Sequence, residues 1–345
     1  MVVGICGLGY TGSGAVIDLL KEYRGITVLD EMEFPLVYET DGLEDLFYHV
    51  NNPSRFFKCD VAIERFKDKV CQYFEIDTSQ WENIDKSEVL RLTDGFLSSI
   101  CQVEWKGIWG YDIQNKKGIS LLMYRIVFKL LRMYPKHFYN YYRRKYYRTM
   151  HLSVKPENFI SASKCYLKRL FDIAGYPVKK EGITVYNQLF SGDRPARGFQ
   201  FFDEAKAIIV DKDPRDLYIL LKKEIHIDGS WMPTDNVEDF IVYYKRMREY
   251  ADYSDVNNIL VVRFEDLIYE YNKTTSEIER FLGINQSTHT CIKEFFQPSK
   301  SINNTQLFRK YPELISDISR IEAELKSYLY PFDNYPIITV FGESF

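Results

Sequence analysis

Residues 1–16 read MVVGICGLGYTGSGAV, and this stretch decides the fold class. The apolar, β-branched run at residues 2–6 predicts a buried strand, and Gly7, Gly9 and Gly12 then form the pattern GxGxxG. Apolar residues recur at helical spacing over residues 15–23, and residues 26–29 predict a second strand. The order strand, glycine loop, helix and strand places backbone N–H groups at a helix N-terminus, where the helix dipole also favours a phosphate.

Strands and helices alternate again in the second half of the chain. Strands are predicted at residues 182–188, 205–210 and 258–263, and helices at about 214, 264–282, 287–296 and 312–328. Such alternation is typical of a parallel sheet with helices on both faces, a three-layer α/β/α domain. Residues 41–180 differ, because helical patterns and Phe or Tyr residues dominate there. We therefore expect one α/β domain over residues 1–345, with a large helical insertion at 41–180.

Composition excludes several classes of protein. The chain has 345 residues with 46% hydrophobic and 27% charged residues, which is typical of a globular protein and not of a disordered chain or a rod. Its net charge of -4 gives no support for a nucleic-acid partner. The six cysteines form no CxxC pair, so we expect reduced thiols in the cytoplasm, with neither a disulfide framework nor a metal site. No run of 18 apolar residues predicts a membrane span.

The glycine loop alone has more than one interpretation. GxGxxG after a strand, with Asp30 at the end of the next strand, is the fingerprint of dinucleotide binding and would indicate an NAD(P)-dependent dehydrogenase. An ATP or GTP hydrolase would need Gly-Lys-Ser/Thr, whereas Gly12 is followed by Ser13.

Four blocks together resemble the family of PAPS-dependent sulfotransferases. Residues 10–15 (YTGSGA) resemble the phosphosulfate-binding loop, and residues 205–216 (AKAIIVDKDPRD) resemble the strand and helix start that contact the 3′-phosphate. Residues 259–267 (ILVVRFEDL) with 281–284 (FLGI), and residues 299–305 (SKSINNT), resemble two further segments in the family's order. The resemblance implies a P-loop NTPase-like fold and PAPS as the donor, with PAP as product.

The resemblance assigns donor-binding roles to individual residues. The 5′-phosphosulfate would be held by the loop residues Tyr10, Thr11, Gly12, Ser13, Gly14 and Ala15. The 3′-phosphate end would be held by Lys212, Arg215, Lys300, Ser301, Asn303 and Asn304. Three positions depart from the pattern: Tyr10 replaces the basic residue of the loop, Lys212 replaces an arginine, and Leu220 replaces a serine. Another cation is needed because charge builds on the leaving phosphate, and Lys300, Arg194 and Arg197 are candidates. These departures also leave open a catalytically degenerate nucleotide-binding protein.

The segment after the second strand supplies candidate bases. Residues 31–34 (EMEF) resemble the Glu-x-x-Phe segment of carbohydrate sulfotransferases, which implies Glu31 as the catalytic base, with Glu33 as its rival, and a carbohydrate or glycolipid acceptor. The alternative is that both are solvated acids. Arg194 and Arg197, in the predicted loop 191–197, could bind an anionic acceptor or lie in a solvated turn.

Residues 124–148 form a basic, tyrosine-rich block with eight Lys or Arg residues and no acid. One interpretation is a binding face for the acceptor or for peripheral membrane contact. The other is a helix that packs its tyrosines against the core and leaves its cations in solvent.

Overall fold

The computed structural model describes residues 1–53, 55, 57–76, 84–109, 112, 116–175, 177–179, 181–225 and 231–338, with no side-chain description for residues 30–32, 57, 75 and 76. The chain divides into two compact units. Residues 1–38 and 176–345 form the sheet unit, and residues 39–175 form the helical unit.

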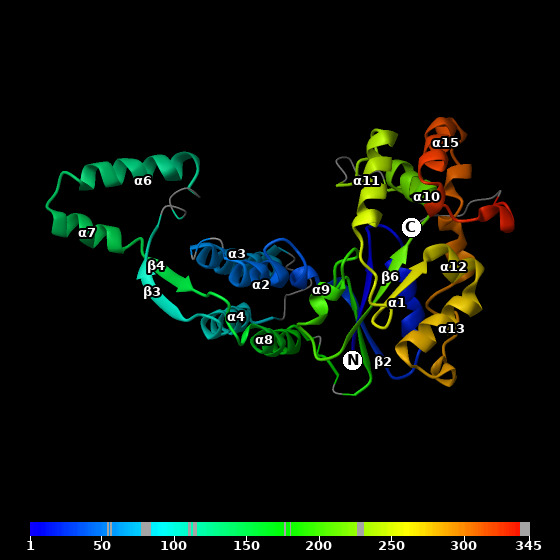
Figure 1. Ribbon diagram of the computed structural model, residues 1–345, viewed down its shortest axis with the longest axis horizontal. Helices are drawn as coiled ribbons and strands as arrows, with labels where there is room; N and C mark the ends of the chain where they lie inside the picture. The colour runs from blue at the N-terminus through cyan, green and yellow to red at the C-terminus, as the bar shows by residue number, and fades with distance from the viewer. Residues whose placement is uncertain are drawn as a thin grey trace. The chain divides into compact units, whose positions relative to one another are not determined.

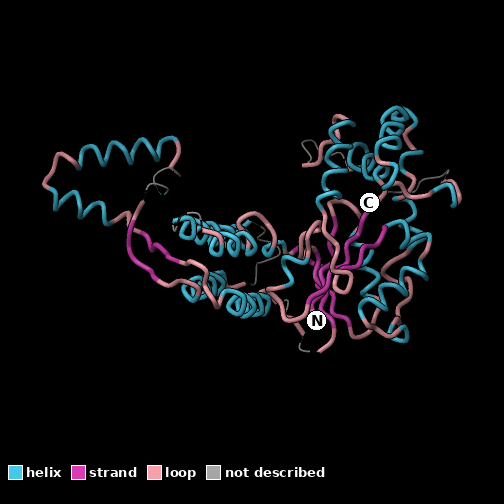
Figure 2. Tube along the Cα trace, in the orientation of Figure 1, coloured by secondary structure: helices cyan, strands magenta, loops and turns pink. Residues whose placement is uncertain are grey.

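The sheet unit is built on five parallel strands: β1 (Val2–Gly7), β2 (Ile26–Glu33), β5 (Ile183–Asn187), β6 (Ala205–Asp211) and β7 (Ile259–Arg263). Their order across the sheet is β2-β5-β1-β6-β7. The central strand β1 is buried from Val2 to Cys6, as its apolar sequence predicts. Figure 2 shows these strands grouped together. The predicted mixed α/β fold with a parallel sheet is confirmed.

The strand order bears on the dinucleotide interpretation. In the dinucleotide-binding fold the strand that follows the first helix pairs with the first strand. Here β5 lies between β1 and β2, so β2 is an edge strand. Asp30, predicted at a strand end, lies within β2, and the carboxyl end of β2 is not next to the end of β1, where the glycine loop begins. The topology disfavours an NAD(P) site formed by these two elements.

Different elements cover the two faces of the sheet. One face packs against α1 (Ser13–Lys21), α12 (Phe264–Tyr269) and α13 (Tyr271–Leu282), in a core that includes Val3, Ile5 and Leu20. The other face meets the segment after β5, which contains the short helix α9 (Ala196–Phe199): a side chain at Gly4 would lie 2.6 Å from the Phe190 ring.

A second core lies beyond the carboxyl ends of the strands. It joins α10 (Pro214–Ile219), the π-helix η2 (Leu220–Glu224), α11 (Val237–Tyr250) and α15 (Ile315–Glu324) around Phe240, Tyr244 and Ile321. Figure 1 shows α10, α11 and α15 together at one end of the sheet.

The predicted helix at 287–296 is wrong, and the cause is a buried carboxylate. Only a 3-10 turn, η3 (Gln286–Thr288), forms there. Glu22, which is fully buried, accepts hydrogen bonds from the backbone N–H groups of Lys293, Phe295 and Phe296 at 2.9–3.1 Å and contacts His289 Nε2 at 2.7 Å. N–H groups bound to this carboxylate are not available to a helix.

The helical unit contains α2 (Leu43–Asn51), α3 (Phe57–Ile76), α4 (Lys86–Ser99), α6 (Gly118–Leu131), α7 (Lys136–Arg144) and α8 (Phe159–Ile173), with one antiparallel strand pair, β3 (Val103–Gly107) and β4 (Arg148–Leu152). Aromatic rings fill its core: Phe96 stacks on Tyr166 at 4.6 Å between centroids, and Phe66 meets both. Much of the aromatic excess of the sequence therefore packs inside this unit.

Candidate donor-binding site

A cavity of about 410 Å³ lies in the sheet unit at the carboxyl ends of the strands. The loop after β1, the residue after β6 and the start of α12 after β7 all contribute to it, because parallel strands end at one edge of the sheet. The lining residues are Tyr10, Gly12, Gly14, Ala15, Asp18, Lys212, Leu220, Ile225, Phe264, Phe295, Phe296, Gln297, Lys300, Ser301 and Asn304. Eight of these are predicted donor-binding residues, and they come from three sequence blocks more than 80 residues apart.

The glycine loop presents backbone donors to this cavity. Gly9, Tyr10 and Gly12 have φ of +87°, +53° and +90°, and α1 begins directly after Gly12. Within the described chain no acceptor is hydrogen-bonded to the N–H groups of residues 9–14. Unpaired N–H groups of a left-handed turn at a helix N-terminus form an anion-binding arrangement.

Position 12 requires glycine because its φ is left-handed and because a side chain there has no room. A side chain at this position would lie 2.4 Å from the ring of Phe264. Phe264, the aromatic residue of the RFEDL block, is buried and forms the wall beneath the loop. The third sequence block therefore contributes to the site, although its residues were not among the predicted ligands.

The two hydroxyls of the loop differ in their surroundings. Ser13 Oγ accepts a hydrogen bond from Gln188 Nε2 at 3.2 Å. Thr11 is 2% exposed, and its Oγ has no hydrogen-bond partner within the described residues. A buried hydroxyl without a partner is costly and leaves Thr11 with an unused hydrogen-bonding group, although neither Thr11 nor Ser13 is among the residues that line the cavity.

Lys212 supplies a buried cation. It is 2% exposed, and its Nζ lies 4.7 Å from the Phe264 ring centroid with no ion-pair partner among the described residues. Burial lowers the pKa of Lys212, and the nearby carboxylates of Asp216, Glu265 and Asp213 oppose that shift. A bound anion would favour the charged lysine further, which suits a phosphate site.

Arg215 lies outside the cavity lining. Its guanidinium donates to Asp213 Oδ1 and Oδ2 at 3.0 and 2.8 Å, to Glu322 at 3.0 Å and to the Tyr330 carbonyl at 3.0 Å, and it stacks on Phe308 at 4.3 Å. The structure therefore does not bring Arg215 together with Lys212 at the cavity, although the two are three residues apart.

The fourth block reaches the cavity through α14 (Pro298–Ser301) and the 3-10 turn η4 (Ile302–Asn304). Lys300 is exposed, whereas Ser301 and Asn304 are buried and line the cavity. Asn303 is half-buried and is not in the lining.

Several residues at or near the cavity belong to no sequence motif and were not predicted. Trp231 stacks on Tyr10 at 6.2 Å between ring centroids, and Trp231 and Met232 lie where a side chain at Gly9 would be. Phe295 and Phe296 form another wall, which the Glu22 carboxylate holds in place. Leu220, which stands where the family has a serine, also lines the cavity.

The predicted acceptor residues come from β2 and from the segment after β5, and of those with a described side chain, Glu33, Arg194 and Arg197, none lines the cavity. Glu31 is in β2, but its side chain is outside the described part of the structure. Glu33 is exposed at the end of β2. Arg194 stacks on Tyr250 at 3.8 Å and donates to the Tyr250 carbonyl at 3.0 Å, and Arg197 is exposed on α9. The predicted loop 191–197, whose last two residues belong to α9, contacts the end of β1, because a side chain at Gly192 would lie 2.1 Å from the Gly7 carbonyl oxygen.

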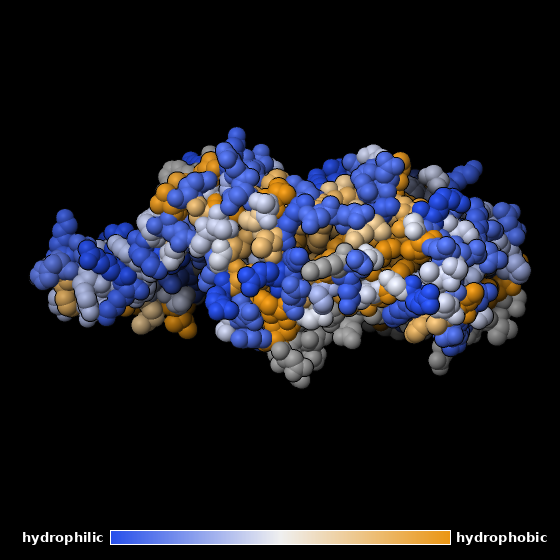
Figure 3. Space-filling model, turned by 90° about the horizontal axis from the view of Figure 1, so that it is seen from below, coloured by the Kyte–Doolittle hydropathy of each residue, from blue (hydrophilic) through white to orange (hydrophobic). Residues whose placement is uncertain are grey.

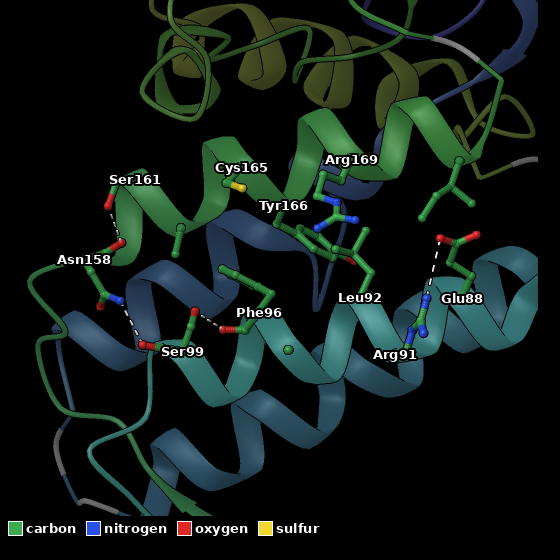
Figure 4. A pocket seen from close by; sticks show the side chains of 13 residues that line it. Glu88, Arg91, Leu92, Phe96, Ser99, Asn158, Ser161, Cys165, Tyr166 and Arg169 are labelled. Carbon is green, nitrogen blue, oxygen red and sulfur yellow. Dashed lines mark hydrogen bonds and ion pairs between the residues drawn. The ribbon is translucent and has the colours of Figure 1, made fainter.

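The helical unit has a cavity of its own, about 610 Å³, between α4 and α8 (Figure 4). Phe96 and Tyr166 form its apolar wall, and Arg169 reaches from α8 toward α4 beside Tyr166. Arg91 of α4 pairs with Glu88 at 3.7 Å. The cavity therefore combines aromatic and cationic groups.

Comparison with known proteins agrees with the sequence blocks. Residues 227–325 match the family model described as sulfotransferase domain. No curated protein matches the chain. The chain thus resembles the sulfotransferases, as the four blocks predict, and the match includes the third and fourth of them.

Two solved structures are similar over most of their length. One is described as the sulfotransferase domain from the curacin biosynthetic pathway, at 11% identity, with 96% of this chain and 98% of that chain covered and a TM-score of 0.37. The other is retinol dehydratase in complex with androsterone and the inactive cofactor PAP, at 13% identity, with 97% and 82% covered and a TM-score of 0.33. Because both TM-scores are low, neither likeness bears on the function of this chain.

Proposed function

We propose that this protein is a sulfotransferase that moves a sulfonate group from PAPS to a hydroxyl or amine acceptor, a carbohydrate or glycolipid. One observation carries the proposal: the cavity of the sheet unit gathers residues of all four sequence blocks, represented by Gly12, Lys212, Phe264 and Lys300. The sulfotransferase family model, matched over residues 227–325, supports the same conclusion.

The charge distribution of the cavity suits a molecule with two anionic ends. In this proposal the free N–H groups of residues 9–14 and the Thr11 hydroxyl bind the phosphosulfate. Lys212, Lys300, Ser301 and Asn304, which line the same cavity, bind the phosphates of the donor in this proposal. PAPS supplies an activated sulfonate, so the protein has to position it and to stabilise the charge that develops on the leaving phosphate.

The structure reduces the number of residues that can replace the basic residue missing at Tyr10. Arg194 is engaged with Tyr250, and Arg197 lies on α9, whereas Lys212 and Lys300 line the cavity together with Tyr10. We assign the compensating charge to these two lysines. Arg215 has a supporting role in this assignment, since its hydrogen bonds hold Asp213 at the start of α10.

Glu31 is proposed as the general base, with Glu33 as the alternative. The base takes the proton of the acceptor hydroxyl while the acceptor oxygen forms its bond to sulfur and the bond from sulfur to the phosphate oxygen breaks. Both glutamates belong to the carboxyl end of β2, the edge of the sheet where the glycine loop also begins. The Glu-x-x-Phe resemblance at residues 31–34 supports the carbohydrate or glycolipid class of acceptor.

Transfer of radiolabelled sulfonate from PAPS to a panel of glycans and glycolipids tests the proposal. We expect labelled product with at least one acceptor, and its loss in the Glu31→Gln variant. PAP binding without transfer to any member of the panel would instead favour the second candidate, a nucleotide-binding protein without catalysis. The replacement of the loop cation by Tyr10, whose ring stacks on Trp231, is the observation that favours this alternative.

A further inference from the structure

Helices α6 and α7 form a hairpin, defined here as residues 116–147, that packs through aromatic rings on one side only. Phe128 of α6 lies 5.9 Å from Tyr139 and 5.1 Å from Tyr146, and Tyr124 lies 5.8 Å from Tyr146. Phe128 and Leu131 are the buried residues of α6, and α7 has none. The tyrosines of the basic block therefore pack chiefly within the hairpin.

The other side of α6 is apolar and exposed. Its exposed apolar residues are Ile119, Leu122, Met123, Ile126 and Leu130, followed by Met133 in the turn after the helix. Their exposed fractions run from 43% at Ile126 to 81% at Met133. Residues spaced by three and four positions share one helix face, so these side chains form a continuous stripe.

The hairpin is also strongly cationic. Its basic residues are Lys116, Lys117, Arg125, Lys129, Arg132, Lys136, Arg143, Arg144 and Lys145, and no acidic residue occurs between 116 and 147. Within the described structure none of these nine has an ion-pair partner, whereas Arg148, just beyond, pairs with Asp60 and Asp112. Figure 3 shows mostly hydrophilic residues over the region of α6 and α7, with a smaller apolar group beside them. Folding thus leaves both the charge and the apolar stripe available.

A surface that is both cationic and apolar fits one kind of partner better than the others. A second copy of the hairpin would bring the same positive charge to the contact, and a nucleic acid would leave the apolar stripe in water. An anionic bilayer surface satisfies both, since lipid phosphates and carboxylates face the cations while the stripe enters the acyl boundary. Tyr134, Tyr141 and Tyr146 are 40–60% exposed, and tyrosine is enriched at the level of the lipid headgroups.

We propose that the α6–α7 hairpin binds anionic membrane surfaces, with α6 lying in the plane of the interface. At 14 residues α6 is about 21 Å long, too short to cross the hydrocarbon core. None of the described helices is long and apolar enough to span a membrane. The proposal is independent of the sulfonate transfer proposed above.

Co-sedimentation of the full chain with vesicles tests this. We expect binding to vesicles of phosphatidylcholine with phosphatidylserine, at least tenfold weaker binding to phosphatidylcholine alone, and loss of binding as salt rises from about 0.1 to 1 M. The Leu122→Glu/Ile126→Glu variant should bind the mixed vesicles at least tenfold more weakly. The Val242→Glu/Val256→Glu variant makes the same charge change at exposed apolar positions of the sheet unit and should bind as the original protein does.

A second variant separates charge from the apolar stripe. Arg143→Gln/Arg144→Gln/Lys145→Gln should weaken binding to the mixed vesicles by about 100-fold, because each basic residue at an anionic surface contributes roughly fivefold. Thermal melting followed by circular dichroism should be unchanged in all variants, since the substituted side chains are exposed. Equal binding to both vesicle types, or full binding by Leu122→Glu/Ile126→Glu, would overturn the proposal. So would a dimer in solution that this variant dissociates, in the absence of vesicle binding.

Discussion

The carboxylate of Asp216 accepts a hydrogen bond from the backbone N–H of Gln306 at 2.7 Å, and a weaker one from Phe308 at 3.4 Å. Asp216 is fully buried at the start of α10, 90 residues away in sequence from its partner. The contact fastens the second sequence block to the segment just after Asn304, and so holds the fourth block beside the cavity. Burial raises the pKa of Asp216, as does the neighbouring Asp213 carboxylate, while Lys212 and the Gln306 N–H oppose the shift.

Replacement of Asp216 by Ala should loosen the fourth block. The buried N–H of Gln306 would lose its acceptor, at a cost of about 1–3 kcal/mol, and the partly buried N–H of Phe308 would lose its weaker one. We expect a lower free energy of unfolding in urea and at least tenfold weaker PAP binding by calorimetry. Asp239→Ala, an exposed acid on α11, is the matched control and should leave both quantities unchanged. An Asp216→Ala variant with the original PAP affinity would show that this contact does not position the site.

Gly12→Ala should close the glycine loop to a ligand. The new methyl group would lie 2.4 Å from Phe264 at a φ of +90°, so both sterics and backbone conformation oppose it. We expect a loss of about 1–3 kcal/mol in unfolding free energy and no measurable PAP binding. Gly95→Ala, which meets no atom within 4 Å in the helical unit, serves as control. Unaltered PAP binding by Gly12→Ala would contradict the placement of the phosphosulfate at this loop.

Replacing each candidate base by glutamine should show which of the two acts in catalysis and that neither is needed for donor binding. Glu31→Gln should reduce kcat by about 10²- to 10⁴-fold and leave PAP affinity unchanged, because the group acts on the acceptor proton alone. Glu33→Gln should reduce kcat little. The reverse order would make Glu33 the base, and full activity in both variants would remove the proposed role of this segment.

Acid should weaken the helical unit through Asp60. Burial raises the pKa of Asp60, but hydrogen bonds from His151 and Arg148 outweigh it and bring the pKa to about 2, from 3.8. A carboxylate with a lower pKa in the folded state stabilises the fold above pH 4, and that contribution disappears as the pH falls toward 2. It corresponds to about 2 kcal/mol.

Urea unfolding at pH 5 and pH 2 checks this sign. The original protein should lose more stability than Asp60→Asn over that interval, and Asp60→Asn should be the less stable of the two at pH 5. Other acidic groups titrate over the same range in both proteins, so the diagnostic quantity is the difference between the two proteins in how much unfolding free energy each loses from pH 5 to pH 2. An equal loss in both proteins would contradict the lowered pKa of Asp60.

The local pattern of the sequence predicts the sheet strands and the glycine loop, because the strand side chains are apolar and buried and because Gly9 and Gly12 adopt left-handed φ. The family blocks also bring eight of their twelve predicted donor residues to the cavity lining, Gly12, Lys212 and Lys300 among them, whereas Thr11, Ser13, Arg215 and Asn303 are not in the lining. Contacts between irregular segments that are distant in sequence carry no such signal. Trp231 reaches Tyr10 through an irregular segment, and Glu22 holds residues 293–296 out of a helix by hydrogen bonds across more than 270 positions.

The roles within the KDPRD segment, residues 212–216, could not be predicted from the sequence either. Both Lys212 and Arg215 are cations at a strand end, and the motif treats them alike. In the structure Arg215 is enclosed by Asp213, Glu322 and Phe308, whereas Lys212 faces the cavity without an ion-pair partner among the described residues. Only the fold decides which cation is left for a ligand.

Calorimetric titration with PAP tests the central claim most directly, using the original protein, Lys212→Met, Lys300→Met and the control Lys273→Met on α13. We predict saturable binding to one site, weakened at least tenfold by Lys212→Met and by Lys300→Met, since a charge-assisted hydrogen bond contributes about 1.5–3 kcal/mol. Lys273→Met should bind as the original protein does. No heat of binding at about millimolar PAP, or the same affinity in all four proteins, would contradict the assignment of this cavity to the sulfonate donor.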